Sequence, residues 1–255
     1  MISAPVRAIK QLILLGLLGS LLPLTSLAQV QTSTVNQHFW LAYFGDHPVS
    51  ERWQIHVDAQ WRRHDLGLTW QQLLVRPAIN YKLSDHVLVT GGYAFIDSFR
   101  YGEFPRAYRA PEHRIFEQLI LNHGAGAAAI QHRFRVEQRL LGQRRDPNVN
   151  DINSWRHQNR FRYFARAAIP LGSSKYYLAL YNEVFVNFAN RGTRTIFDQN
   201  RAYAGIGFPV ARATRLEFAY MMQTIQQPSG TVFEHNNTLQ ISIFSNLPLF
   251  GNRNP

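Results

Sequence analysis

The chain has 255 residues and a formal net charge of +11, and it contains no cysteine. This length is ample for one sizeable domain. The lack of cysteine excludes disulfide bonds and a lipidated cysteine anchor, so an exported domain would depend on its core or on surrounding lipid. After the N-terminal region, no apolar run approaches the roughly 18 residues that suggest a transmembrane helix.

The first 28 residues are typical of a secretory signal peptide. Arg7 and Lys10 supply a positive n-region, residues 11–22 form an apolar segment, and small residues precede the expected cleavage site after Ala28. A membrane anchor is the alternative, but the apolar segment is short for one. We therefore expect residues 29–255 to form the mature protein as a single domain.

The charge of the mature chain bears on its partners. Loss of Arg7 and Lys10 leaves +9 (11 − 2). So basic a protein could bind nucleic acid, but a secretory signal argues against that partner. The phosphates of lipopolysaccharide, or another periplasmic anion, fit the charge better.

The first predicted strands follow a polar lead-in. Residues 38–44 read as a strand that ends in a turn at 45–48. The cleanest alternation follows over residues 53–61, with Trp53 and Trp61 on the apolar face. Side chains that alternate in this way lie on opposite faces of a β-strand.

The next strand, over residues 72–83, contains a proline. Pro77 has no N–H to donate to a neighbouring strand, so we expect a bulge or an irregular pairing there. Residues 87–95 form the following strand. Residues 112–122 are strand-like but ambiguous in phase, because Glu117 falls in register with apolar neighbours.

Residues 130–140 combine one apolar face with one charged face. Phe134 and Val136 lie on the apolar side, opposite Arg133, Arg135, Glu137 and Arg139. Such a strand can have its charged face in water or inside a polar barrel. The same alternation continues over five further segments, at 160–169, 176–187, 201–208, 215–223 and 234–244.

Two regularities favour a membrane barrel. Connections near 46, 85, 124, 172 and 211 are short, whereas those near 66, 104, 148, 191 and 228 tend to be longer, as in outer-membrane barrels. Aromatic residues also gather near strand ends. Trp53 and Trp61 are separated by roughly 26 Å along the strand, or about 20 Å vertically after tilt, which approaches the height of a lipid-facing band.

These patterns predict an all-β fold, an antiparallel up-and-down transmembrane β-barrel of about 10–12 strands. We count eleven strand-like segments, although bacterial barrels of one chain use even numbers. Either residues 30–37 hold a twelfth strand, or the segment near Trp40 is not in the wall. A soluble lipocalin-like protein is the alternative fold, but it leaves the aromatic strand ends and the loop alternation unexplained.

Several short motifs, in order, resemble a known family. They comprise Pro77 with Tyr81, Gly91-Gly92-Tyr93, Glu112-His113-Arg114, His132 to Arg139, Arg160 to Tyr163, Tyr181 to Phe185, and Asp198 to Gly205. This order is similar to that of the bacterial family named domain of unknown function 2490, over about residues 40–244. The resemblance implies a barrel in the outer membrane of a Gram-negative bacterium. It implies no activity or catalytic residue.

In a membrane barrel, the charged faces point into the lumen. The candidate ligand-binding residues are those that we expect there: Arg133, Arg135, Glu137, Arg139, Arg160, Arg162, Arg166, Glu183 and Arg201. Arginine–carboxylate pairs would connect the strands, and a narrow barrel is largely filled by such side chains. The alternative function is an anion-attracting pore or binding cavity, because arginines outnumber acids on these strands.

A lipid-modifying hydrolase is a third possibility, and it would need a serine near a histidine base. Ser154 with His157, and Ser242 with His235, are the candidates in the sequence. Neither pair has a recognisable signature, so we expect no enzyme activity.

No histidine spacing indicates a metal site, and we expect no cofactor. We expect a monomer in the bacterial outer membrane, in contact with its lipids, with lipopolysaccharide and with the barrel-assembly machinery.

Overall fold

The computed structural model describes residues 32–188 and 195–248, which belong to one compact unit. The predicted signal peptide lies outside the described residues, as does most of the connection predicted near 191. In the part of the chain that the structure describes, no helix is long and apolar enough to cross a membrane.

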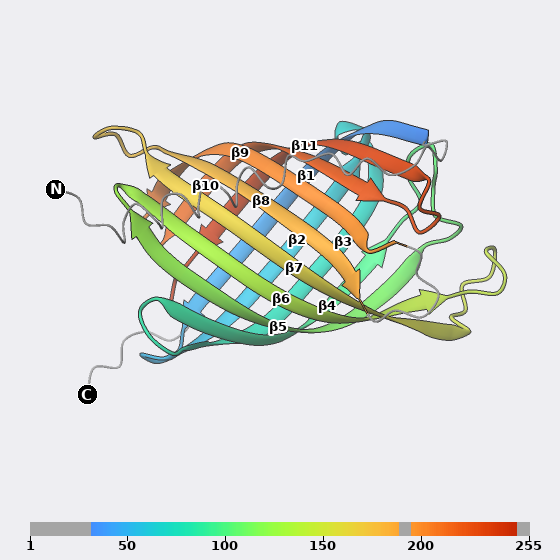
Figure 1. The fold of residues 1–255 in the computed structure, drawn as a ribbon, viewed down its shortest axis with the longest axis horizontal. Coiled ribbons are helices and arrows are strands. Elements are labelled where there is room, and N and C mark those ends of the chain that lie inside the picture. Colours follow the sequence, from blue (N-terminus) through green and yellow to red (C-terminus); the bar gives the residue numbers. More distant parts are fainter. Residues whose placement is uncertain (1–31, 189–194, 249–255) are drawn as a thin grey trace. The chain divides into compact units, whose positions relative to one another are not determined.

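The described residues form a closed barrel of eleven strands (Figure 1). The strands are β1 (Thr32–Pro48), β2 (Trp53–His64), β3 (Thr69–Lys82), β4 (Val87–Ser98), β5 (Ala110–Ala125), β6 (Ala128–Gln143), β7 (Ser154–Pro170), β8 (Tyr177–Phe188), β9 (Phe197–Ala211), β10 (Thr214–Gln226) and β11 (Val232–Ser245). Each strand pairs antiparallel with the next along the chain. Most are longer than predicted, and the all-β barrel prediction is confirmed.

The barrel closes through a parallel pair. β1 lies beside β11 in one unbroken register from Thr32 with Val232 to Gly45 with Ser245. This closure accounts for the odd number of strands, because the first and last strands then run in the same direction. It is the one exception to the antiparallel pattern among the described strands.

The residue range predicted for the first strand is wrong. Residues 32–37 are neither a lead-in nor a separate twelfth strand, and the segment near Trp40 belongs to the wall. Both form one strand that continues through the predicted turn at 45–48. Asn36 illustrates why a polar segment belongs here, since its side chain donates a hydrogen bond of 2.8 Å to Asn236 on β11.

Polar side chains line the interior, and apolar side chains cover the exterior. On β6, Arg135, Glu137 and Arg139 are buried, whereas Leu140 on the other face is 42% exposed. The same division holds on β2, where Asp58 is buried and Trp61 is exposed. Strand alternation in a closed barrel produces this division, although Leu74, Ala94 and Ile96 on β3 and β4 form an apolar cluster inside the barrel.

Large apolar side chains are exposed on the exterior around the barrel, among them Trp53, Ile79, Ile115, Tyr220 and Leu239. Glu117 lies on this exterior face in the middle of β5, which settles the phase of that strand. Its carboxylate accepts a hydrogen bond of 3.2 Å from Gln138 of β6.

The expected difference between the two ends of the barrel is present. One end, at the right of Figure 1, carries the connections 99–109 and 144–153. The opposite end carries tight turns, including residues 126–127 and 212–213. We call these the long-loop rim and the short-turn rim.

Pro77 does not shift the register of its strand. Its pairing with Val57 on β2 belongs to an unbroken series, and the pairing with β4 lacks only residues 76 and 77 before resuming in the same register. The irregular pairing expected at Pro77 is therefore confined to this interruption, and the register shifts in the wall lie beside Arg62, Phe185 and Thr214.

Candidate functional site

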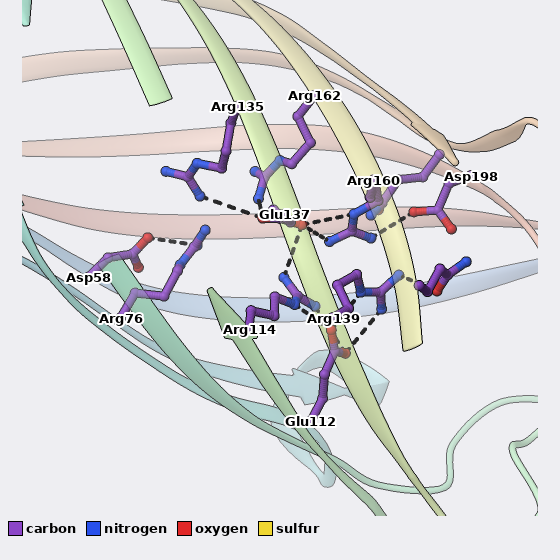
Figure 2. Close-up of polar contacts among 12 residues, drawn as sticks. Asp58, Arg76, Glu112, Arg114, Arg135, Glu137, Arg139, Arg160, Arg162 and Asp198 are labelled. Atoms are coloured by element: carbon purple, nitrogen blue, oxygen red, sulfur yellow. Dashed lines mark hydrogen bonds and ion pairs between the residues drawn. The ribbon is translucent and has the colours of Figure 1, made fainter. Parts of the chain in front are cut away.

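A network of ion pairs crosses the barrel interior around one carboxylate (Figure 2). Glu137 is fully buried, and its two oxygens each lie 2.6 Å from a guanidinium nitrogen, of Arg160 and of Arg162. Arg114 and Arg135 lie at 3.6 and 3.8 Å. The carboxylate is therefore compensated from three strands, β5, β6 and β7, as a buried charge requires.

Glu183 of β8 forms a second centre next to the first. Its carboxylate lies 2.6 Å from Arg162 and 2.7 Å from Arg133, with Arg201 at 3.8 Å. Because Arg162 contacts both Glu137 and Glu183, the two centres form one network. Charge-assisted hydrogen bonds of this kind fix side chains and strands in place.

Further pairs extend the network towards both rims. Near the long-loop rim, Glu112 contacts Arg114 and Arg139. Towards the short-turn rim, Glu217 contacts Arg166 and accepts hydrogen bonds from two tyrosines. On the neighbouring strands β2 and β3, Asp58 and Arg76 form a further ion pair (Figure 2), with 2.6 Å between oxygen and nitrogen.

Two β-bulges turn extra polar side chains inward. On β9, Asp198 has no partner on β8, because the register shifts beside it, and its carboxylate contacts Arg160 at 2.7 Å. On β3, Gln71 is the unpaired residue, and it accepts a 2.7 Å hydrogen bond from the Trp40 indole. Bulges commonly redirect a side chain in this way.

Some buried arginines are held by amides and not by carboxylates. Arg62 donates to Gln60 and Gln72, and no acidic side chain contacts it in the described structure. Arg135 donates to Gln118 at 2.6 and 2.8 Å, and its nearest carboxylate oxygen is 3.8 Å away.

Aromatic rings support these guanidinium groups. The Arg62 guanidinium carbon lies 3.9 Å from the centre of the Trp40 ring, and that of Arg201 lies 5.2 Å from the same ring. Arg162 lies over Phe185 at 4.3 Å. Cation–π contacts of this type contribute about 0.5–2 kcal/mol each, depending on desolvation.

A cavity of about 390 Å³ occupies the half of the barrel nearer the long-loop rim. Loop residues, including Tyr101 and Arg106, help to line it. Nine arginines and three acidic residues line the cavity: Arg62, Arg76, Arg106, Arg114, Arg139, Arg156, Arg160, Arg162 and Arg201, with Glu112, Asp198 and Glu234. The lining is therefore strongly positive.

Tyr101 connects the loop over this cavity to the wall. Its hydroxyl donates a 3.1 Å hydrogen bond to Glu234 of β11, and its ring packs 5.4 Å from both His38 and His64. Burial and the neighbouring carboxylate raise the pKa of the Tyr101 phenol, so it stays protonated and able to donate.

Behind Tyr101 lies a group of buried polar atoms that have no partner among the described residues. Within the described part of the chain, neither ring nitrogen of His38 has a hydrogen-bond partner, and the same is true of His64 Nδ1 and Thr238 Oγ1. His38 is opposite His64 on β2 and Thr238 on β11. Such unpaired atoms normally cost stability.

The comparison with known proteins covers most of the barrel. A family model described as "Protein of unknown function (DUF2490)" matches residues 37–234. The chain belongs to the DUF2490 family. The resemblance seen in the sequence is thereby confirmed, and the protein is a β-barrel protein of unknown activity.

One relative in this comparison is an uncharacterized protein of Methylorubrum extorquens. It is 28% identical over 178 residues, which cover 68% of this chain and 72% of the relative. Among solved structures, the NanC porin is similar with a TM-score of 0.48 and 11% identity, over 79% of this chain and 90% of the porin. The siderophore receptor PirA of Pseudomonas aeruginosa gives a TM-score of 0.29 at 10% identity, over 70% of this chain and 32% of the receptor.

All nine candidate ligand-binding residues of this DUF2490 protein point into the barrel interior. Four of them, Arg139, Arg160, Arg162 and Arg201, line the cavity. The other five, Arg133, Arg135, Glu137, Arg166 and Glu183, do not line it and belong to the network.

Sequence reasoning missed several cavity residues. Arg62 and Arg76 were on the polar faces of their predicted strands, so the alternation that selected the other arginines could have included them. Arg114 was hidden by the uncertain phase around Glu117. Trp40 faces inward against the usual pattern, and nothing in its local sequence distinguishes it from a lipid-facing aromatic residue.

Two glycines within strands leave room for neighbouring aromatic rings, whereas Gly91 has no atom within 4 Å of the place a side chain would take. A side chain at Gly207 would meet the Tyr177 ring, and one at Gly92 would meet Phe116 and Ala78.

The structure does not assemble the serine–histidine pairs. Ser242 is buried in the interior, where it accepts a hydrogen bond from Gln240, whereas His235 lies on the other face of β11 and contacts Thr224. Ser154 and His157 are both exposed, and no hydrogen bond joins them. Among the described residues, no three acidic, histidine or cysteine side chains are grouped so that they could hold a metal ion.

Proposed function

We propose that this protein is an outer-membrane β-barrel with an anion-binding cavity in its interior. The cavity lies on the long-loop side of the ion-pair network, which closes the middle of the barrel. The barrel wall supports the location, since a closed barrel satisfies every strand edge and its exterior is largely apolar. In this proposal the protein contacts outer-membrane lipids and lipopolysaccharide, and the barrel-assembly machinery inserts it. It functions as a monomer, by binding and not by catalysis.

The observation that carries the anion proposal is the charge of the cavity lining. Nine arginines face a space that only three acidic side chains share. In a narrow, partly desolvated space, such an imbalance attracts small anions and repels cations.

The network around Glu137 has a different role in this proposal. Its side chains are bound to one another and fill the middle of the barrel, so they act as a structural plug. Conduction is then narrow or absent.

Planar bilayer recordings test the electrostatic part of the proposal. The purified mature protein should give either no conductance or small steps that favour chloride over potassium. Large, cation-selective steps would contradict it.

The location is tested separately. Expressed protein should remain in the membrane fraction after washing with high salt, and its gel mobility should change on boiling, as folded membrane barrels show. Release by salt alone would support the soluble alternative.

A further inference from the structure

Two cavity arginines differ from their neighbours in what holds them. Arg62 is 6% exposed and Arg201 is 9% exposed, so both are buried. Arg62 has no acidic partner in the described structure, and Arg201 has one only at 3.8 Å, from Glu183. The other buried arginines of the cavity each contact a carboxylate at 2.6 Å or less.

Glutamine side chains hold both guanidinium groups in place. Arg62 donates to Gln60 and Gln72. Arg201 donates to Gln199 at 3.4 Å, and an amide of Gln223 turned with its oxygen towards Arg201 lies 3.2 Å from Nε and Nη2. An amide oxygen orients a guanidinium without neutralising it, so the positive charge remains available.

The Trp40 ring brings the two arginines together. Both guanidinium carbons lie against it, at 3.9 and 5.2 Å from its centre, so their separation cannot exceed the sum of these distances. The ring is itself fixed by its hydrogen bond to Gln71. The result is a rigid pair of cations at the wall of the cavity, and neither has a carboxylate oxygen closer than 3.8 Å in the described structure.

We propose that Arg62 and Arg201 form a seat for one oxyanion group, a carboxylate or a phosphate, of a small solute. This inference rests on the proposed anion-binding function and names its ligand class. Guanidinium groups present N–H donors in a planar fork that matches these oxyanions. A bound oxyanion supplies the negative charge that the glutamines do not.

The size of the cavity limits the rest of the ligand. About 390 Å³ is at the lower end of the range for small-molecule sites. It accommodates inorganic phosphate or an acid the size of one sugar unit, and it excludes a folded macromolecule.

Calorimetric titration of the purified full barrel in detergent tests this seat. Inorganic phosphate and glucuronate are the two probes, and glucose is the uncharged control. Binding of either anion, with no binding of glucose, is the expected result, and the better probe identifies the oxyanion class. If neither anion binds, or if glucose binds as well as glucuronate, the seat is rejected.

Three variants locate the binding. Arg62→Gln and Arg201→Gln should each weaken the anion affinity about tenfold or more, which is typical for loss of a charge-assisted contact. Gln72→Glu keeps both arginines but gives Arg62 a carboxylate partner, and it should weaken binding to a similar degree. At present Ser98 Oγ accepts a hydrogen bond from the Gln72 amide, and its hydroxyl can instead donate to the glutamate, so this variant should fold.

Two matched controls separate the seat from general charge effects. Gln118→Glu adds a carboxylate beside Arg135, outside the cavity, and Arg215→Gln removes one charge near the opposite rim. Both should keep the affinity within about twofold of the parent, as expected for substitutions distant from the site. Equal weakening by these controls, or no weakening by the three test variants, would overturn the assignment. If the Arg62–Arg201 site is rejected in this way but the barrel still conducts anions selectively, the proposed function remains supported.

Discussion

At the residue scale, Glu137 is the side chain on which the interior network depends. It is fully buried, and four arginines surround it. Two of these arginines also contact a second acid, Arg160 with Asp198 and Arg162 with Glu183. Removal of the Glu137 carboxylate would therefore break the central ion pairs and leave these outer pairs in place.

We predict that Glu137→Gln lowers the free energy of unfolding by about 3 kcal/mol, because buried cations then lack their common partner. Denaturant unfolding of the refolded barrel measures this. Glu103→Gln, in an exposed loop, is the control and should change little. A Glu137→Gln midpoint equal to the parent's would show that the remaining acids suffice.

The unpaired hydroxyl of Thr238 leads to the opposite expectation. Thr238→Val removes a buried group without a partner, so the unfolding free energy should stay equal or rise by about 1 kcal/mol. Ser242→Ala is the matched comparison on the same strand, since its hydroxyl accepts a bond from Gln240. That variant should lose about 1 kcal/mol. The reverse order of the two variants would indicate that Thr238 has a partner.

At the scale of strands, Glu117 is an exception on the exterior of β5. In the proposed outer-membrane location, this carboxylate faces lipid and costs stability, and Gln138 donates only one hydrogen bond to it, at 3.2 Å.

Glu117→Leu should therefore raise the stability of the barrel in lipid vesicles, by about 1–2 kcal/mol, and raise it less in aqueous detergent. Glu217→Leu, on the interior, should destabilise the barrel because Arg166 and two tyrosines lose their acceptor. Equal or lower stability of Glu117→Leu in lipid would argue that this face does not contact hydrocarbon.

The strand faces could be predicted from the sequence, but the bulges could not. Alternation with a period of two assigned Arg135 and Glu137 to one face without any knowledge of their partners. A bulge adds one residue and shifts the odd–even assignment of faces by one, so Asp198 and Gln71 looked like residues of the opposite face. The cavity contacts made by these two residues therefore depended on pairing between strands, which the sequence does not display.

At the scale of the whole molecule, the parallel seam between β1 and β11 was also beyond local reasoning. Seam partners such as Asn36 and Asn236 are 200 positions apart, and no turn connects their strands. The polar start of β1 resembled a loop because near the rim both of its faces carry small polar residues.

Cysteine cross-linking tests the seam in a chain that has no natural cysteine. Leu41→Cys with Ile241→Cys places two thiols at directly paired positions, and a short bifunctional reagent should link them efficiently. Leu41→Cys with His235→Cys is the control, since six residues along a strand correspond to about 20 Å. Preferential linkage of the control pair would show a different register.

The odd strand count has a consequence for how the two sides of the barrel can be addressed. A chain with an even number of wall strands ends at the same rim where its first strand began. Here Thr32 starts at the long-loop rim and Ser245 finishes at the short-turn rim. In the proposed outer-membrane location, two labels, one beside each of these residues, would therefore report on opposite sides of the membrane from a single molecule, and would reveal its orientation without an antibody against any loop.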